Sequence, residues 1–205
     1  MIVARNYEAN EVLKDGQRVT IRAIRPDDKE HILKAFPEVD KNSLYLRFFK
    51  FKKDISDQEL RFLTEVDFIN HMALVVFAHV NGRDKLIGGG RYIAYGDPVK
   101  SHRAEVAFLV HDNYHGQGIA TIIMKHLVII ARSHGISEFE ADVLPENKSM
   151  LAVFSHAGLT MSTSRIDNVI HIVLSLSSDF EHRGAKVPEV GSKQRRKVMG
   201  TPDKK

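Results

Sequence analysis

Val110-His-Asp-Asn-Tyr-His115-Gly-Gln-Gly118-Ile-Ala120 is the stretch of this 205-residue chain that decides its fold. The β-rich run 103–111 precedes the two glycines. Residues with helical spacing follow them as far as Gly135: Ile119, Ile122, Ile123, Leu127, Ile130 and Ala131. Residues 138–144 then alternate acidic and apolar side chains, as a strand does. The stretch therefore predicts a strand–helix–strand unit whose two strands are parallel.

Antiparallel strands and short helices are predicted on both sides of this unit. The turn sequence Asn81-Gly82 lies between the runs 72–80 and 85–95, which predicts a hairpin. A closing hairpin is predicted from the runs 159–166 and 169–176. Upstream, the sequence predicts a strand at 17–24 and helices after Arg25, around 43–50 and after the capping box Ser56–Glu59. A short helix should begin at Asn147 and end at Gly158. The predicted fold class is α/β (α+β mixed sheet), with a mostly antiparallel central sheet splayed at one parallel βαβ crossover.

Composition and charge limit the function further. The chain has no cysteine, which excludes a disulfide framework, a thiolate zinc site and a cysteine nucleophile. Its N-terminus lacks a continuous apolar run, and no later run approaches the roughly 20 residues that span a bilayer. We expect a cytoplasmic protein. The net charge of +4 arises from a basic segment, because residues from Arg183 onward carry +6 and the rest −2. We expect an N-terminal extension (1–16), one domain (17–178) and a basic, disordered tail (179–205).

The glycine loop is suited to bind an anion. Glycines let the backbone approach a ligand, and the free N–H groups of a first helical turn attract phosphate. Two glycines before a helix can also serve only to turn the chain. A dinucleotide fold is disfavoured because Thr121 stands where its third glycine belongs and because no second βαβ half follows.

The sequence around the loop resembles a known family. Val110 to Ala120 is similar in spacing to the acetyl-CoA signature V-x-P-x-x-[QR]-x-x-G-x-[GA] of the GNAT superfamily, with Asp112 in place of proline and His115 in place of Gln/Arg. Further segments resemble the catalytic domain of bacterial Pat-type protein lysine acetyltransferases, and together they cover about residues 17–176. They include Val19–Asp28, Ser43–Phe49, Leu63–Asp67, His71–Leu74, Ile87–Tyr92 and Ala104–Phe108.

The resemblance implies acetyl-CoA as co-substrate and a GNAT-like fold. It assigns Glu105 as general base, and a backbone N–H at Leu109 or nearby as the group that polarises the thioester carbonyl. Phe154 stands where many relatives place a tyrosine as general acid. The cofactor-binding residues that it implies are Leu109, Val110, His115, Gly116, Gln117, Gly118, Ile119, Ala120, Asn147 and Phe154.

Simpler interpretations of single residues stay open. Glu105 could be a salt-bridged glutamate, Asn147 a helix N-cap, and Arg47 a packing residue with its charge at the surface. His111 and His115 have no carboxylate third ligand nearby in the sequence, so no metal is expected.

The main functional hypothesis is acetylation of protein lysine side chains. A small-amine acetyltransferase and a non-catalytic acyl-CoA-binding or sensing module are the alternatives. Acceptor specificity should depend on loops such as 50–57 and 96–102. We expect no membrane partner, and nucleic acid is disfavoured because the basic charge lies in the tail. The sequence leaves a homodimer open.

Overall fold

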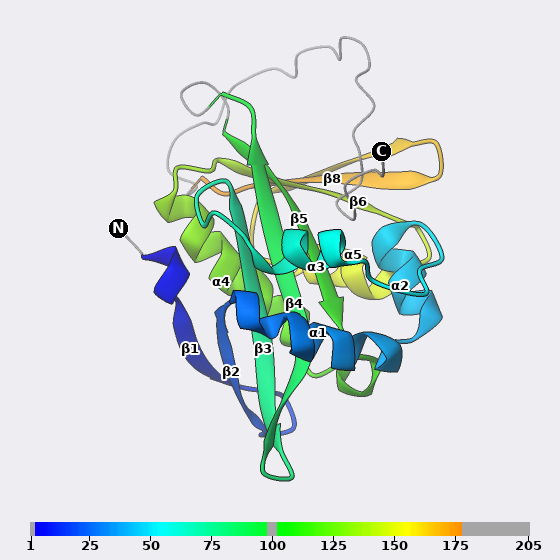
Figure 1. The fold of residues 1–205 in the computed structure, drawn as a ribbon. Helices are drawn as coiled ribbons and strands as arrows, with labels where there is room; N and C mark the ends of the chain where they lie inside the picture. Colours follow the sequence, from blue (N-terminus) through cyan, green and yellow to red (C-terminus); the bar gives the residue numbers. More distant parts are fainter. Residues whose placement is uncertain (1–2, 98–101, 178–205) are drawn as a thin grey trace.

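The computed structural model describes residues 3–97 and 102–177, which form one eight-stranded sheet flanked by helices (Figure 1). The strand order is β1-β2-β3-β4-β5-β6-β8-β7, and only β5 and β6 are parallel neighbours. This confirms the predicted mixed sheet. The strands are β1 (Glu8–Val12), β2 (Arg18–Ala23), β3 (His71–Val80), β4 (Arg83–Tyr95), β5 (Arg103–Val110), β6 (Glu138–Val143), β7 (Met161–Ile166) and β8 (Val169–Ser175).

Strand β1 was not predicted. It lies within the range assigned to an N-terminal extension, yet it pairs antiparallel with β2 along its whole length. Its sequence, Glu8-Ala-Asn-Glu-Val12, has few β-forming residues, so the neighbouring strand and not local preference determines its conformation. The division into extension, domain and tail stays a prediction, and residues 178–205 lie outside the described part of the chain.

The main helices are α1 (Lys29–Ala35), α2 (Lys41–Phe48), α3 (Asp57–Thr64), α4 (Ile119–Ser133) and α5 (Lys148–Ser155). Helix α2 begins two residues before the predicted start, because the Asp40 side chain accepts the N–H of Asn42 at 2.7 Å and so caps the helix there. The predicted capping box of α3 is present, with reciprocal contacts between Ser56 and Glu59. Among the described residues, no helix combines the length and hydropathy needed to cross a membrane.

The two faces of the sheet pack against different helices. Helix α4 inserts Ile119, Ile123 and Leu127 into the main core, which also holds Val106 and Phe108 of β5. On the opposite face, a smaller cluster that includes Ile24, Ala73 and Val75 packs against Ile32 of α1. Helices α1, α2 and α3 lie together on that side of the sheet in Figure 1, and we call them the helix layer. Gly90 lets α4 pack closely, because a Cβ there would lie 2.5 Å from the Ile123 side chain.

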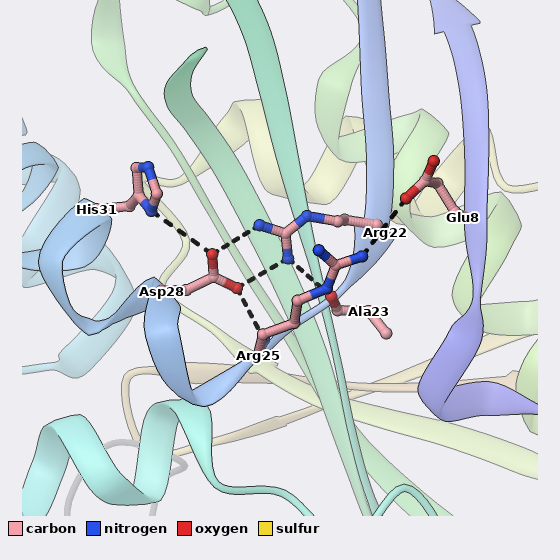
Figure 2. Close-up of polar contacts among 6 residues, drawn as sticks. All are labelled: Glu8, Arg22, Ala23, Arg25, Asp28 and His31. Carbon is pink, nitrogen blue, oxygen red and sulfur yellow. Dashed lines mark hydrogen bonds and ion pairs between the residues drawn. The ribbon is translucent and has the colours of Figure 1, made fainter. Parts of the chain in front are cut away.

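A buried ion pair attaches the helix layer to the sheet (Figure 2). Asp28 precedes α1 and is 2% exposed, and Arg22 of β2 contacts both of its carboxylate oxygens at 2.6 and 2.8 Å. The N–H of Arg25 also donates to Asp28 at 2.7 Å. Burial acts to raise the pKa of Asp28, but the hydrogen bonds from Arg22 and Arg25 outweigh it and hold that pKa below its ordinary value. The carboxylate therefore stays charged and fixes where α1 begins.

Strands β5 and β6 diverge after a short pairing. Their three paired positions end at Glu105↔Glu140, whereas β5 continues to pair with β4 as far as Val110. The second half of β5 therefore has one free edge. This opening positions the site described next.

Candidate active site

A cavity of about 880 Å³ occupies the divergence of β5 and β6. Its walls come from β5, the following loop, the first turn of α4, the end of β6, α5 and α2. Ten of the eleven residues proposed from the sequence line it, and Gln117 does not. The ten are Glu105, Leu109, Val110, His115, Gly116, Gly118, Ile119, Ala120, Asn147 and Phe154.

Two glycines of the loop between β5 and α4 line this cavity. Gly116 and Gly118 have φ values of +78° and +89°, a region that favours glycine. Gly118 is the N-cap of α4 and supplies no side chain to cap the helix. The first N–H groups of a helix have no intrahelical acceptor, so this end of α4 offers donors and a positive dipole to an anion.

Lys14 is a site residue that the sequence did not indicate. It lies in the turn between β1 and β2, lines the cavity, and its Cε is 3.7 Å from the position of a Cβ on Gly118. Its N–H donates to the carbonyl of Gln117 at 3.3 Å. A lysine beside the helix N-terminus adds positive charge where an anion would bind. No local motif marks it, because the contact joins segments about one hundred residues apart.

His115 and His111 stabilise the loop by different contacts. The Nε2–H of His115 donates to the carbonyl of Val110 at 3.0 Å, so this side chain closes the loop on itself. His111 is buried, its Nδ1 accepts the N–H of Asn113 at 3.3 Å, and its Nε2 contacts a Glu38 carboxylate oxygen at 3.1 Å. Among the described residues, no group of three or more His, Cys, Asp or Glu side chains could hold a metal ion.

Glu105 points away from α4 and toward the helix layer. Its neighbours Ala104 and Val106 belong to the α4-side core, and alternation along a strand places Glu105, Ala107 and Leu109 on the opposite face. Arg47 of α2 lines the same cavity. Burial lowers the pKa of Arg47 to about 10, and the negative charge of Glu105 opposes that fall. A carboxylate and a half-buried guanidinium thus line the cavity together.

The free edge of β5 also presents backbone donors. The N–H of His111 donates to Ile87 of β4 at 2.9 Å, in register with the pairs Leu109↔Gly89 and Val110↔Gly88. Since backbone groups alternate along a strand, the N–H of Leu109 is directed at β4, whereas those of Phe108 and Val110 are directed at the opening. The polarising N–H implied for Leu109 or nearby therefore fits Val110 or Phe108 better than Leu109 itself.

A second row of charges lies beside Glu105 on β6 and β8. Glu140 is the Cα partner of Glu105, is 2% exposed, and binds Arg103 at 3.1 Å. His171 binds Asp142 at 2.8 Å and Glu140 at 3.4 Å. Hydrogen bonds from these two carboxylates raise the pKa of His171 to about 9, so it is protonated at neutral pH. Asp142 lines the cavity but already has this cationic partner.

Asn147 and Phe154 of α5 complete the wall. The side-chain oxygen of Asn147 accepts the N–H of Met150 at 3.1 Å, so it caps α5 as the N-cap interpretation expects. Phe154 is 1% exposed and packs edge-on against Phe108, with ring centroids 6.0 Å apart. Phe154 therefore shapes the cavity and offers no proton.

Comparison with known proteins gives consistent results. The model of the acetyltransferase (GNAT) family matches residues 39–159. Acetyltransferase Pat of Mycolicibacterium smegmatis is 31% identical over 71% of this chain, and the match spans 42% of that relative. Acetyltransferase PA5475 of Pseudomonas aeruginosa is 29% identical over 68% of this chain and 74% of its own.

Two solved structures extend the comparison. The GNAT domain of S. lividans PAT superposes with a TM-score of 0.74 and 34% identity, covering 82% of this chain and 96% of its own. The yncA protein of Salmonella typhimurium, solved with its cofactor acetyl-CoA, superposes with a TM-score of 0.61 at 17% identity over 83% of this chain and 99% of its own. At that identity, the second likeness concerns the fold alone.

Proposed function

This chain belongs to the acetyltransferase (GNAT) family, and we propose that it acetylates lysine side chains of proteins, with acetyl-CoA as donor and Glu105 as general base. One observation carries the proposal. The carboxylate-bearing face of β5 and the N-terminus of α4 line one cavity, so a base and an anion-binding loop border the same space. The likeness to Acetyltransferase Pat and to the GNAT domain of S. lividans PAT agrees with the Pat-type resemblance of the sequence, which implies a protein lysine as acceptor.

The residues of the cavity fit a coenzyme A thioester. Its pyrophosphate would be held by the N–H groups at the start of α4, by the glycine loop and by Lys14. The pantetheine arm would lie in the divergence of β5 and β6, where the N–H groups of Phe108 and Val110 are available. The donor supplies an activated acetyl group, which an amine can accept.

Glu105 has the task of removing a proton. A lysine ammonium with an ordinary pKa near 10.4 is almost entirely protonated at pH 7 and is not a nucleophile. A carboxylate on the cavity wall accepts that proton, directly or through one water, as the C–N bond forms and the C–S bond breaks. The charge that develops on the carbonyl oxygen would be stabilised by the N–H of Val110 or Phe108.

The departing coenzyme needs little help from the protein. A thiol has an ordinary pKa of about 8.5, so its thiolate leaves readily near neutral pH. Phe154 therefore does not argue against catalysis. We also keep the predictions of a cytoplasmic location and of a possible homodimer, which await direct measurement.

The test is acetyl transfer by the purified chain. The protein is incubated with acetyl-CoA and an N-terminally blocked lysine peptide, and mass spectrometry locates any acetyl group. The same peptide with arginine in place of lysine is the control, and a small diamine probes the alternative acceptor class. Transfer to the diamine alone would overturn the lysine assignment. Binding of acetyl-CoA without transfer to any amine would favour the sensing-module alternative.

A further inference from the structure

A second cavity of about 130 Å³ lies between the helix layer and strands β3, β4 and β5. We call it the acyl chamber, for the role argued below. Its walls are almost entirely apolar. They include Ile32, Phe36, Val39, Phe48, Ile55 and Leu63 from the helix-layer side.

Small residues on neighbouring strands form the floor of the acyl chamber. Ala73 of β3, Gly89 of β4 and Ala107 of β5 all line it. The sheet register places them close together, because Arg91 is the Cα partner of both Ala73 and Ala107, and Gly89 is paired with Val75. The chamber therefore lies where Ala73, Gly89 and Ala107 leave space beside Arg91, whose side chain reaches the carbonyls of Phe62 and Leu63.

The acyl chamber adjoins the main cavity. Four residues line both spaces: Arg47, Ala107, Phe108 and Leu109. The shared wall is the part of β5 beyond its pairing with β6, where the thioester would lie. The coenzyme would enter from the β6 side of this wall and the acceptor amine from the side of Glu105. The alkyl end of the acyl group is then directed toward β4 and the chamber.

We propose that the acyl chamber receives the alkyl chain of acyl-CoA donors longer than acetyl, with straight chains of three to five carbons. This inference rests on the proposed function, since it concerns the donor of the same reaction. A water-sized group takes about 30 Å³, so the chamber has room for roughly four such groups.

The walls favour an alkyl chain over water or a charged chain. An apolar pocket that offers water few hydrogen-bond partners favours an apolar ligand. Three polar side chains line the chamber, Arg47, Arg91 and His111, and each has a polar or charged neighbour. Arg91 donates to the carbonyls of Phe62 and Leu63 at 3.4 and 3.2 Å, and His111 contacts Glu38. Arg47 at the mouth is next to the negative charge of Glu105.

Calorimetry with the intact chain tests the proposal without relying on turnover. The probes are coenzyme A, acetyl-CoA, propionyl-CoA, butyryl-CoA and succinyl-CoA. Each methylene added beyond acetyl should tighten Kd about fourfold, the fold-change that burial of one methylene at about 0.8 kcal/mol gives. Butyryl-CoA should thus bind about 15-fold tighter than acetyl-CoA, and succinyl-CoA more weakly than butyryl-CoA.

Two variants test whether the chain lies in the acyl chamber. Ala73 lines this chamber and not the main cavity, so Ala73→Val should leave acetyl-CoA binding unchanged and remove the advantage of butyryl-CoA. Ala94→Val, at a half-buried β4 position that lines neither cavity, is the matched control and should keep the advantage. Ile55 also lines this chamber and not the main cavity, so Ile55→Ala enlarges the chamber and should extend the preference to hexanoyl-CoA. This second variant tests the proposal if Ala73→Val does not fold.

Three results would overturn the inference. One is equal affinity for acetyl-CoA and butyryl-CoA in the unaltered protein. Another is a folded Ala73→Val variant that keeps the butyryl preference, and the third is succinyl-CoA binding more tightly than butyryl-CoA. These leave the proposed function standing, whereas failure of every acyl-CoA to bind would overturn both.

Discussion

The two sides of β5 are built in different ways. On the α4 side, the site consists of backbone groups: a glycine loop, a helix N-terminus and the free edge of a strand. On the helix-layer side it consists of side chains with charge, and these come from distant segments, as Arg47, Glu105 and Asp142 do. A site made of backbone tolerates changes of side chain, whereas a site made of paired charges depends on each member. Substitutions on the two sides should therefore affect different steps.

The largest effect is expected from Glu105→Gln, which keeps the shape of the side chain and removes the carboxylate that we propose as the base. It should lower kcat/KM for the acceptor by about 10² to 10⁴ at pH 7, the usual contribution of a general base. Affinity for acetyl-CoA should not change, because the anion-binding groups lie on the loop and on α4. Steady-state kinetics and calorimetry measure the two quantities separately.

Raising the pH provides the check on Glu105. More of the acceptor amine is neutral at higher pH, so the variant should recover part of its activity. Full activity of Glu105→Gln from pH 6 to 9 would place the base elsewhere and remove the functional contrast between the two sides.

Gly118→Asp should instead lower the affinity for acetyl-CoA. An aspartate there puts negative charge at the α4 N-terminus and forces a side chain into a φ of +89°, so acetyl-CoA affinity should fall by about 10² or more. Gly135→Asp is the matched control, because its φ of +74° imposes similar strain far from the cavity lining. Calorimetry on both folded variants measures the loss of acetyl-CoA affinity in each. Equal losses of affinity would show that strain, and not the anion site, is responsible.

The same contrast explains how far the sequence predicts the molecule. The loop, α4 and the Asn147 cap follow from short-range patterns, because glycine conformation and helix capping depend on residues a few positions apart. Lys14 beside Gly118, Arg47 near Glu105 and the pairing of β1 join residues far apart in the chain, and no local pattern encodes them. The sequence therefore indicated most of the residues that line the backbone-built side but only Glu105 of the side-chain-built side, and the roles of these residues stay predictions.

Asp112 joins the two sides, and it stands where the family signature has proline. Its carboxylate accepts the N–H of Asp40 at 2.7 Å and the hydroxyl of Ser43 at 2.5 Å, which holds the start of α2 against the loop. Asp112→Pro suits the backbone, because Asp112 is the first residue of a 3₁₀ turn and His111 before it is extended (φ −62°, ψ 134°).

We expect Asp112→Pro to lower kcat/KM for the acceptor about tenfold, since hydrogen bonds to a charged group are each worth about 1.5 kcal/mol or more. Acetyl-CoA affinity should change little. Ser43→Ala removes one of the two contacts and should have a smaller effect. If Asp112→Pro weakens only cofactor binding, Asp112 belongs to the loop and does not position α2.

The smallest effect is expected from His171→Gln, which tests whether the charges beside Glu105 are balanced. The contacts with Asp142 and Glu140 raise the pKa of His171 to about 9 in the folded protein, whereas an unfolded chain has an ordinary value near 6.5. The stabilisation is therefore complete below pH 6.5 and is lost as the pH rises through 9. His171→Gln should lower the free energy of unfolding by about 1 kcal/mol at pH 6, since the site is partly exposed, and by little at pH 10. Urea denaturation at both pH values measures the difference. If the difference in free energy of unfolding between the unaltered protein and the variant is the same at both pH values, His171 contributes packing alone. Arg103 would then balance the charge of Glu140 without help from His171.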